Sequence, residues 1–298
     1  MNITFLGGGN MATALIGGLA GRGSATRGDE TPRGDAATPG GGTPAAPVRI
    51  TVIDPSAPQR ERLARDFGVT ALAAADPALA VGEVLVLAVK PQQMREALLP
   101  LAAGARDALV VSVAAGIRAA DIARWLGGHR RVVRTMPNTP ALIGAGITGL
   151  WAASDVMAAD RMLAERIVRA VGEAVWVGEE VLLDAVTAVS GSGPAYVFAF
   201  MEAMQAAGVR LGLDETSAAR LTLATFRGAA ALAAGATVPL ATLREQVTSK
   251  GGTTAAALAQ LQAHAVSEHI DEAVRAAFRR AGELADEFGR DPGSSARP

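Results

Sequence analysis

The chain has 298 residues, of which half are hydrophobic and only 4% are aromatic; this length predicts two domains, because single hydrophobic cores rarely exceed about 250 residues. The charges of its 28 basic and 29 acidic side chains nearly cancel, so the chain has no large net charge that would attract nucleic acid or an anionic membrane. Any anion must therefore be bound by a local site. Because the chain has no cysteine, disulfides, thiolate metal sites and cysteine nucleophiles are excluded, and a reducing cytoplasm is a compatible location.

The first residues do not resemble a targeting segment. Met1 to Leu6 lacks a positively charged n-region and is followed at once by three glycines, so it predicts a strand. The longest apolar runs, such as Val84 to Val89, are far shorter than the roughly 20 residues that a membrane-spanning helix needs. We therefore expect a soluble protein with no membrane partner.

Short β-rich runs alternate with alanine-rich helical stretches over residues 1–178. This alternation is typical of a parallel sheet with crossover helices, and continuous apolar runs are expected of strands buried on both faces. The predicted strands are Ile3–Leu6, Arg49–Ile53, Val84–Val89, Ala108–Val113 and Val132–Met136, with Gly146–Ala152 and Ala174–Val177 as candidates to extend the sheet. We predict an α/β fold whose N-terminal part, 1–178, is a Rossmann-like doubly wound domain.

Two segments lack any hydrophobic periodicity. Residues 22–47 are rich in Gly, Pro, Thr, Asp and Arg, which predicts a disordered surface insertion between the first helix and the second strand. Residues 290–298 have a similar composition and predict a disordered tail.

From residue 179 onward the β-rich runs give way to helical periodicity, so the part from 179 to 298 is predicted to be all-α. Pro194 is suited to open a helix through Gln205, and Asp214 to cap one through about Ala234; a last amphipathic stretch covers about Ser267 to Phe288. The apolar faces exceed what one small bundle buries, so we expect a homo-oligomer, a dimer or higher, formed through these helices.

A glycine-rich turn follows the first predicted strand. Its residues Gly7, Gly8, Gly9, Asn10, Met11 and Ala12 fit G-x-G-x-x-A and lead into a helical stretch. Such glycines permit a tight turn and close backbone approach, and the helix N-terminus stabilises a pyrophosphate. Glycine turns also join strands to helices for purely structural reasons, but this context favours dinucleotide binding.

The second predicted strand ends at Asp54. An acidic residue here commonly hydrogen-bonds the adenosine ribose and repels a 2′-phosphate, which favours NADH. Ser56 and Arg60 follow and are able to hold a 2′-phosphate if Asp54 points away, which favours NADPH. Asp54 before Pro55 is alternatively a simple turn former. The spacing from the glycine turn exceeds the roughly 20 residues usual for this fingerprint, and the insertion accounts for the excess.

Six motifs together resemble one family, the pyrroline-5-carboxylate reductases. They are FLGGGNM at 5–11, AVKP at 88–91, SVAAG at 112–116, RTMPNTP at 134–140, SGSGPAY at 190–196 and TSKGGTT at 248–254. The likeness spans nearly the whole chain except the insertion and the tail. It implies an oxidoreductase that reduces Δ1-pyrroline-5-carboxylate to L-proline with NADPH or NADH, the last step of proline biosynthesis.

The resemblance also implies which residues hold the cofactor. Those at the pyrophosphate are Leu6, Gly7, Gly8, Gly9, Asn10 and Met11; those along the dinucleotide are Ala88, Val89, Lys90 and Pro91; those near the nicotinamide are Val113, Ala114 and Ala115. All three groups follow predicted parallel strands. They are therefore expected at the carboxyl edge of the sheet, where doubly wound folds bind ligands.

The same resemblance places the substrate carboxylate at a second glycine turn, which precedes a predicted helix. The substrate residues implied are Glu180, Gln246, Ser249, Gly251, Gly252, Thr253 and Thr254. A helix N-terminus with exposed N–H groups favours a carboxylate. This turn taken alone favours an ordinary helix cap with Thr253 or Thr254 as the capping residue, and the other motifs shift the interpretation to substrate binding. Asparagine is frequent in relatives where this chain has Gln246, which keeps the amide, and proline where it has Lys250.

Two residues are predicted to act on the ring nitrogen: Thr254 through its hydroxyl and Glu180 by stabilising positive charge. No obligate general acid is expected, since a protonated iminium accepts hydride readily. The three histidines are scattered, so no metal site is expected. Lys90 is expected to order the cofactor loop rather than to act as a base. Arg134 with Asn138 is consistent with a catalytic pair of an unrelated dehydrogenase and, at least equally, with a structural role at a strand exit.

Two other functions remain open. A β-hydroxyacid dehydrogenase or an imine reductase shares a Rossmann domain followed by a helical domain, but the loop from Ser249 to Thr254 argues against both. A non-catalytic NAD(P)-sensing or scaffolding protein is the alternative from another class, and the intact substrate loop argues against that as well.

Overall fold

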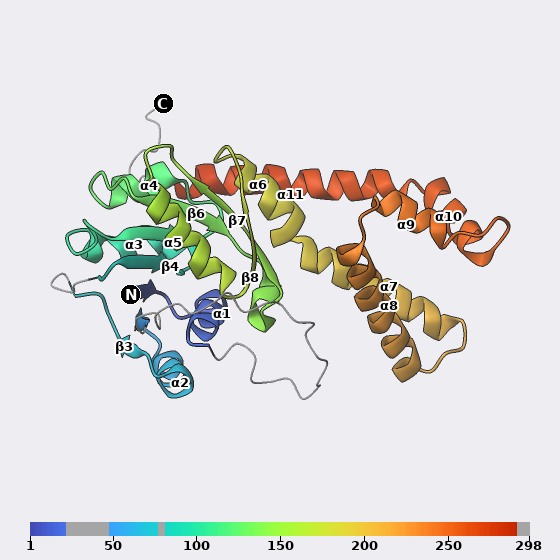
Figure 1. The fold of residues 1–298 in the computed structure, drawn as a ribbon, viewed down its shortest axis with the longest axis horizontal. Helices are drawn as coiled ribbons and strands as arrows, with labels where there is room; N and C mark the ends of the chain where they lie inside the picture. Colours follow the sequence, from blue (N-terminus) through green and yellow to red (C-terminus); the bar gives the residue numbers. More distant parts are fainter. Residues whose placement is uncertain (22–47, 77–80, 291–298) are drawn as a thin grey trace, which may run out of the picture. The chain divides into compact units, whose positions relative to one another are not determined.

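The computed structural model describes residues 1–21, 48–76 and 81–290, so the predicted insertion at 22–47 and nearly all of the predicted tail lie outside the described residues. The chain forms two compact units, one of Met1–Gly191 with Phe278–Pro298 and the other of Ser192–Ala277 (Figure 1). These limits describe spatial clusters; the division into domains at residue 178 stays a prediction.

An eight-stranded sheet, within the described residues, forms the centre of the first unit, in the order β3-β2-β1-β4-β5-β6-β7-β8. The strands are β1 (Asn2–Leu6), β2 (Arg49–Ile53), β3 (Thr70–Leu72), β4 (Val84–Leu87), β5 (Leu109–Ser112), β6 (Val132–Met136), β7 (Gly146–Ala152) and β8 (Gly172–Trp176). All neighbours pair in parallel except β6 and β7. The strand order reverses between β1 and β4, and the carboxyl ends of strands at such a switch point form a ligand crevice.

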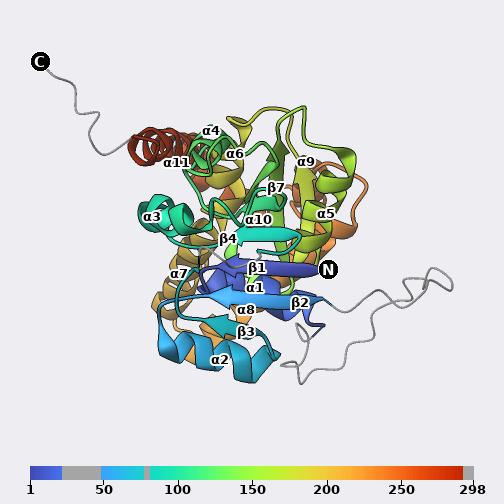
Figure 2. The same ribbon diagram turned by 90° about the vertical axis from the view of Figure 1, so that its left-hand side faces the viewer.

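Helices cover both faces of this sheet (Figures 1 and 2). They are α1 (Asn10–Leu19), α2 (Ala57–Phe67) and α5 (Ala158–Arg169) on one face, and α3 (Met94–Leu98) and α4 (Ala119–Trp125) on the other. Phe5 and Val86 point to the first face with Leu15 and Ile167, while Leu85 points to the second. Burial of alternate residues on both faces explains why the central strands are continuous in apolar side chains.

The prediction of a Rossmann-like α/β fold is confirmed. The five predicted strands all form, and both candidate extensions join the sheet as β7 and β8. β3 was missed because it has only three residues, none of them fully buried. β4 ends at Leu87 rather than Val89, and β5 at Ser112 rather than Val113, so the residues that follow are turned out of the sheet at its carboxyl edge.

Short helical segments lie between the strands of the first unit and after its last strand, β8. They are the 3-10 turns η1 (Pro91–Gln93), η2 (Leu99–Leu101) and η3 (Thr139–Ile143), the helix α6 (Leu182–Val186) and the π-helical turn η4 (Thr187–Gly191). α6 contacts β6, β7 and η4.

The second unit is all-helical. Its helices are α7 (Gly193–Arg210), α8 (Glu215–Gly235), α9 (Leu240–Gln246), α10 (Thr253–Ala263) and the first half of α11 (Val266–Phe288). Pro194 lies in the first turn of α7, and the Asp214 carboxylate caps α8 by accepting the Ser217 N–H at 3.0 Å. α7 continues to Arg210 rather than ending at Gln205 as predicted, since nothing in the sequence breaks it earlier.

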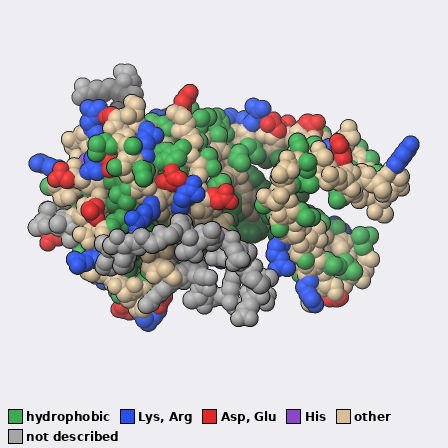
Figure 3. All heavy atoms as spheres, in the orientation of Figure 1, with side chains coloured by type: hydrophobic (Ala, Val, Ile, Leu, Met, Phe, Trp, Pro, Cys, Tyr) green, Lys and Arg blue, Asp and Glu red, His purple; other side chains and the backbone are tan. Residues whose placement is uncertain are grey.

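Large apolar side chains are exposed along the helices of the second unit (Figure 3). Phe198 is 64% exposed, Leu223 60%, Leu232 72% and Leu240 70%, and neither α7 nor α10 has a buried residue. Exposure of so many large apolar side chains is typical of an interaction site. No described helix is long and apolar enough to cross a membrane.

Candidate active site

The glycine loop between β1 and α1 has little room where it touches the sheet. Gly7 has φ +97°, and a Cβ there would lie 2.7 Å from the Ala88 carbonyl oxygen, so only glycine fits. Gly9 is exposed, and a Cβ at its position would have no atom within 4 Å. The loop is therefore packed against the residues that follow β4 on one side and open on the other.

The open side of the loop is the start of α1. Gly9 occupies the N-cap position in an extended conformation, and no side chain caps the helix. The first N–H groups of a ten-residue helix, together with its dipole, therefore face an accessible surface, which is the arrangement that binds a pyrophosphate. The loop Leu6 to Met11 thus fits the phosphates of a dinucleotide.

The carboxylate of Asp54, which follows β2, accepts hydrogen bonds from two backbone N–H groups. Its Oδ2 accepts the Gly8 N–H at 2.7 Å and its Oδ1 accepts the Ser56 N–H at 2.8 Å. Arg60 Nη1 donates to the Asp54 carbonyl oxygen at 2.8 Å, which holds a guanidinium over the same turn. Ser56 is exposed.

The residues after β4 and β5 lie beside the loop. The Ala88 N–H donates to the Leu6 carbonyl at 2.8 Å, and the Val113 N–H to the Leu87 carbonyl at 3.1 Å. The Ala114 N–H is 3.3 Å from Ser112 Oγ, while Lys90 is exposed. The structure therefore brings the three groups of cofactor residues predicted from the sequence to one edge of the sheet.

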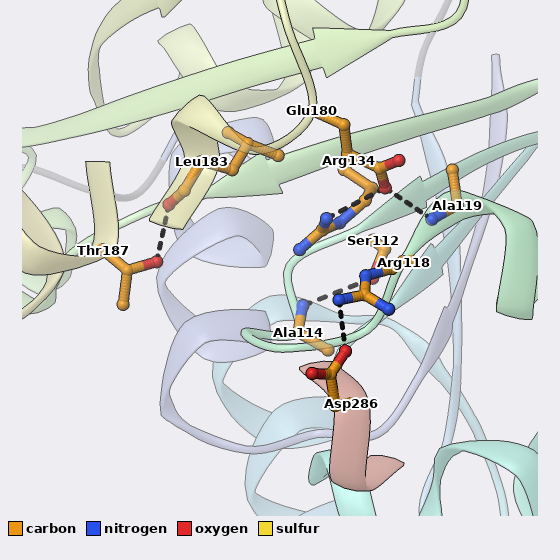
Figure 4. Close-up of polar contacts among 9 residues, drawn as sticks. All are labelled: Ser112, Ala114, Arg118, Ala119, Arg134, Glu180, Leu183, Thr187 and Asp286. Atoms are coloured by element: carbon orange, nitrogen blue, oxygen red, sulfur yellow. Dashed lines mark hydrogen bonds and ion pairs between the residues drawn. The ribbon is translucent and has the colours of Figure 1, made fainter. Parts of the chain in front are cut away.

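A charged network lies near the same edge (Figure 4). Glu180 Oε1 accepts hydrogen bonds from Arg134 Nη1 at 2.9 Å and from the Ala119 N–H at 2.7 Å. Arg118 pairs with Asp286, at the end of α11, at 2.5 Å. Arg134 is 6% exposed and Glu180 is 25% exposed, so this ion pair is partly shielded from water and its geometry is fixed.

Asp184 of α6 adds a third carboxylate to this region. Burial raises its pKa, and the carboxylates of Glu180 and Asp286 raise it further, whereas Arg134 and Arg118 lower it. The net direction is upward, so the protein surroundings disfavour the charged form of Asp184.

The second glycine turn lies in the second unit, between α9 and α10. Gly251 has φ +74°, and the Gly252 N–H donates to the Ser249 carbonyl at 3.0 Å. A Cβ on Gly252 would overlap the Ser249 hydroxyl. No side chain caps α10, whose first two residues are Thr253 and Thr254, so its N-terminal N–H groups suit a carboxylate. Gln246 is the exposed last residue of α9.

The predicted site residues thus form two groups. The cofactor residues and Glu180 belong to the first unit, while Gln246 and the residues from Ser249 to Thr254 belong to the second. Asn138 is structural, because its Oδ1 accepts the Ile147 N–H at 3.0 Å. No group of three potential metal-ligating side chains occurs within 1–21, 48–76 and 81–290.

Sequence comparison decides the family. The chain is 44% identical to the pyrroline-5-carboxylate reductase of Pseudomonas aeruginosa over 97% of this chain and 98% of the relative. The chain belongs to the pyrroline-5-carboxylate reductase family. Residues 180–284 match the profile described as pyrroline-5-carboxylate reductase dimerisation, and residues 2–116 match the one described as NADP oxidoreductase coenzyme F420-dependent.

Solved structures agree with this pyrroline-5-carboxylate reductase assignment. The reductase of Coxiella burnetii is 37% identical, with a TM-score of 0.81 over 95% of this chain and 98% of the other. The Plasmodium falciparum pyrroline carboxylate reductase with NADP bound is 24% identical, with a TM-score of 0.78 over 96% and 98% of the two chains, and it supports the fold.

Several side chains of this reductase site carry no local sequence signal. Gln59 donates to the Gly8 carbonyl, and Arg118 reaches Asp286 across 168 positions in the chain. Arg134 was predicted to be structural at its strand exit, without its partner Glu180. Only the folded chain brings these residues together.

Proposed function

We propose that this protein reduces Δ1-pyrroline-5-carboxylate to L-proline with NADPH or NADH, as the last step of proline biosynthesis. The observation that carries this proposal is the similarity to named reductases over nearly the full length of both chains. The stretch that is similar to these reductases includes both glycine turns, of which one is suited to a pyrophosphate and the other to a carboxylate. The rival dehydrogenase and sensor functions do not account for the second turn.

The cofactor, when bound, supplies the hydride. The loop Leu6 to Met11 holds its pyrophosphate at the start of α1, Ala88 to Pro91 line the dinucleotide, and Val113 to Ala115 approach the nicotinamide. The uncapped helix start supports the first role, and the position of the other two groups at the same sheet edge supports the others.

At the substrate, Ser249, Gly251, Gly252 and Thr253 bind the carboxylate at the start of α10, and Gln246 contributes its amide. Hydride adds to the imine carbon while the C=N π electrons move to nitrogen, which carries the proton, so the product is a secondary amine. The protein's contribution is position and electrostatics rather than a strong acid.

Thr254 and Glu180 act at the ring nitrogen. The Thr254 hydroxyl is at the first turn of α10, suited to hydrogen-bond the nitrogen of a carboxylate-bound substrate. Glu180 Oε1 is held by Arg134 and the Ala119 N–H, while Oε2 has no hydrogen-bond partner among the described residues. That oxygen is available to stabilise a protonated iminium.

The protein acts as a homo-oligomer formed through the helices of the second unit. Their exposed apolar side chains and the match to a dimerisation profile support this. A cytoplasmic location fits the absence of cysteine.

The direct test uses purified protein with pyrroline-5-carboxylate and either NADH or NADPH, followed at the nicotinamide absorbance. Oxidation of at least one cofactor that depends on the substrate, with proline as product, is expected. No oxidation of either cofactor would contradict the proposed function.

Replacing Thr254 with alanine is expected to lower kcat about 10- to 100-fold, because a hydrogen bond to the reacting nitrogen is lost. Thr254→Ser keeps the hydroxyl and should retain most of the activity.

Glu180→Gln should lower kcat to a similar extent, because the negative charge near the iminium is lost. Steady-state kinetics check both, and unchanged kcat and KM in Thr254→Ala and Glu180→Gln would refute these two roles.

A further inference from the structure

We propose that Asp54 is a positioning residue that fixes the shape of the glycine loop, and that it does not select between NADH and NADPH. This inference rests on the proposed use of a nicotinamide dinucleotide. An acidic residue at the end of the second strand is ordinarily expected to bind the ribose, and the contacts of Asp54 give it a different task.

Both carboxylate oxygens of Asp54 already accept backbone N–H groups. Oδ2 binds Gly8 of the cofactor loop at 2.7 Å, and Oδ1 binds Ser56 of its own turn at 2.8 Å. Hydrogen bonds to an ionised acceptor are short and roughly twice as strong as neutral ones. The side chain therefore ties the end of β2 to a loop 46 positions earlier in the chain.

The other side of Gly8 is held as well. Its carbonyl accepts hydrogen bonds from Gln59 Nε2 and from Thr13 Oγ1, and a Cβ at Gly8 would lie 2.8 Å from Leu63 Cδ1 and 3.2 Å from Asp54 Oδ2. The N–H of Gly8 is thus bound by Asp54, and its carbonyl by Gln59 of α2 and Thr13 of α1. This leaves Gly9 and the first N–H groups of α1 as the open surface for phosphate.

These contacts change the expected effect of Asp54 on a 2′-phosphate. Two N–H donors partly compensate its negative charge, so its repulsion of a phosphate is weakened. Arg60 is a cation held at this turn, because its Nη1 donates to the Asp54 carbonyl oxygen, and a guanidinium suits a phosphate. Selection between the two cofactors therefore rests on Arg60.

Titration calorimetry of the full-length protein with NADH and with NADPH, without substrate, tests the inference on Asp54→Ala, Asp54→Asn and Arg60→Ala. Asp54→Ala is expected to weaken the binding of both cofactors by about 10-fold or more, while the ratio of the two affinities stays unchanged within about 3-fold. Asp54→Asn retains an oxygen acceptor for the Gly8 N–H, so its affinity for each cofactor should fall by about 3-fold or less. Arg60→Ala, the matched variant in α2 whose side chain contacts the Asp54 carbonyl, should weaken the binding of NADPH about 10-fold and that of NADH little.

A change of about 10-fold in the ratio toward NADPH in Asp54→Ala or Asp54→Asn would overturn the inference, since that is what loss of a ribose ligand and of its charge produces. Unchanged affinity for both cofactors in Asp54→Ala would overturn it too. If Asp54→Ala does not fold, the ratio of the two affinities in Asp54→Asn tests the claim about selection: a ratio unchanged within about 3-fold supports it, and a shift of about 10-fold toward NADPH overturns it.

Hydrogen exchange of the Gly8 amide in the cofactor-free protein, read by NMR, supplies a measurement that does not depend on the reaction. The exchange is expected to be at least about 10-fold faster in Asp54→Ala than in wild type, because the acceptor is gone, while amides of β5 keep their protection. Equal Gly8 exchange in both proteins would contradict the positioning role. Wild-type protein that binds neither cofactor would instead refute the proposed function and leave this exchange result valid.

Discussion

Replacing Gly172 with alanine is expected to lower the free energy of unfolding of the first unit by about 3–5 kcal/mol. Gly172 starts β8 with φ +151°, and a Cβ there would lie within 2.5 Å of the Gly146 carbonyl carbon and overlap its oxygen. These two glycines are directly opposite in the parallel pairing of β7 and β8. The side chain therefore cannot be accommodated without separating the strands, and β8 leads on toward Glu180.

Urea unfolding followed by tryptophan fluorescence measures this effect, because Trp125, Trp151 and Trp176 are the three tryptophans of the chain and all belong to the first unit. The matched control is Gly178→Ala, two residues after β8, where a Cβ would have no atom within 4 Å. It should change stability by less than about 0.5 kcal/mol. Equal midpoints for Gly172→Ala and wild type would show that the strands are able to separate at no cost.

Replacing Arg134 with methionine is expected to destabilise the first unit by about 2–4 kcal/mol and to lower kcat/KM by at least about 10-fold. Removing one partner of a buried ion pair leaves an uncompensated charge, which costs about 3–5 kcal/mol when both partners are fully buried. Glu180 is 25% exposed, so water reduces that cost. Catalysis falls because Glu180 loses one of the two donors that hold its Oε1.

The control is Arg130→Met on the neighbouring segment. Arg130 pairs with Asp155 at 2.5 Å, but its side chain is 80% exposed, so the loss should be below about 1 kcal/mol with kinetics unchanged. A double-mutant cycle of Arg134→Met with Glu180→Gln measures the coupling directly. Additive effects of the two substitutions on stability and on kcat/KM would argue against the pair as a unit.

Elements with a strong periodic pattern were predictable. The central strands are buried on both faces and are therefore continuous in Val, Ile and Leu. Asp214 caps α8 through a hydrogen bond between residues only three positions apart in the chain. β3 was not predictable, because a three-residue edge strand with one exposed and two partly buried residues leaves no pattern. The lengths of β4 and β5 also depended on where the neighbouring strands stop pairing, which is a property of the sheet.

The sequence by itself determined the family, the Rossmann-like sheet and the glycine loop, because adjacent residues and fixed spacings encode them. Only the tertiary structure decided that Asp54 is turned toward Gly8, that Arg134 and Ala119 hold Glu180, and that Arg118 meets Asp286. These pairs are separated by 46 to 168 positions. Their meeting depends on how strands and helices pack, and the charge on each residue gives no information about which partner it will reach.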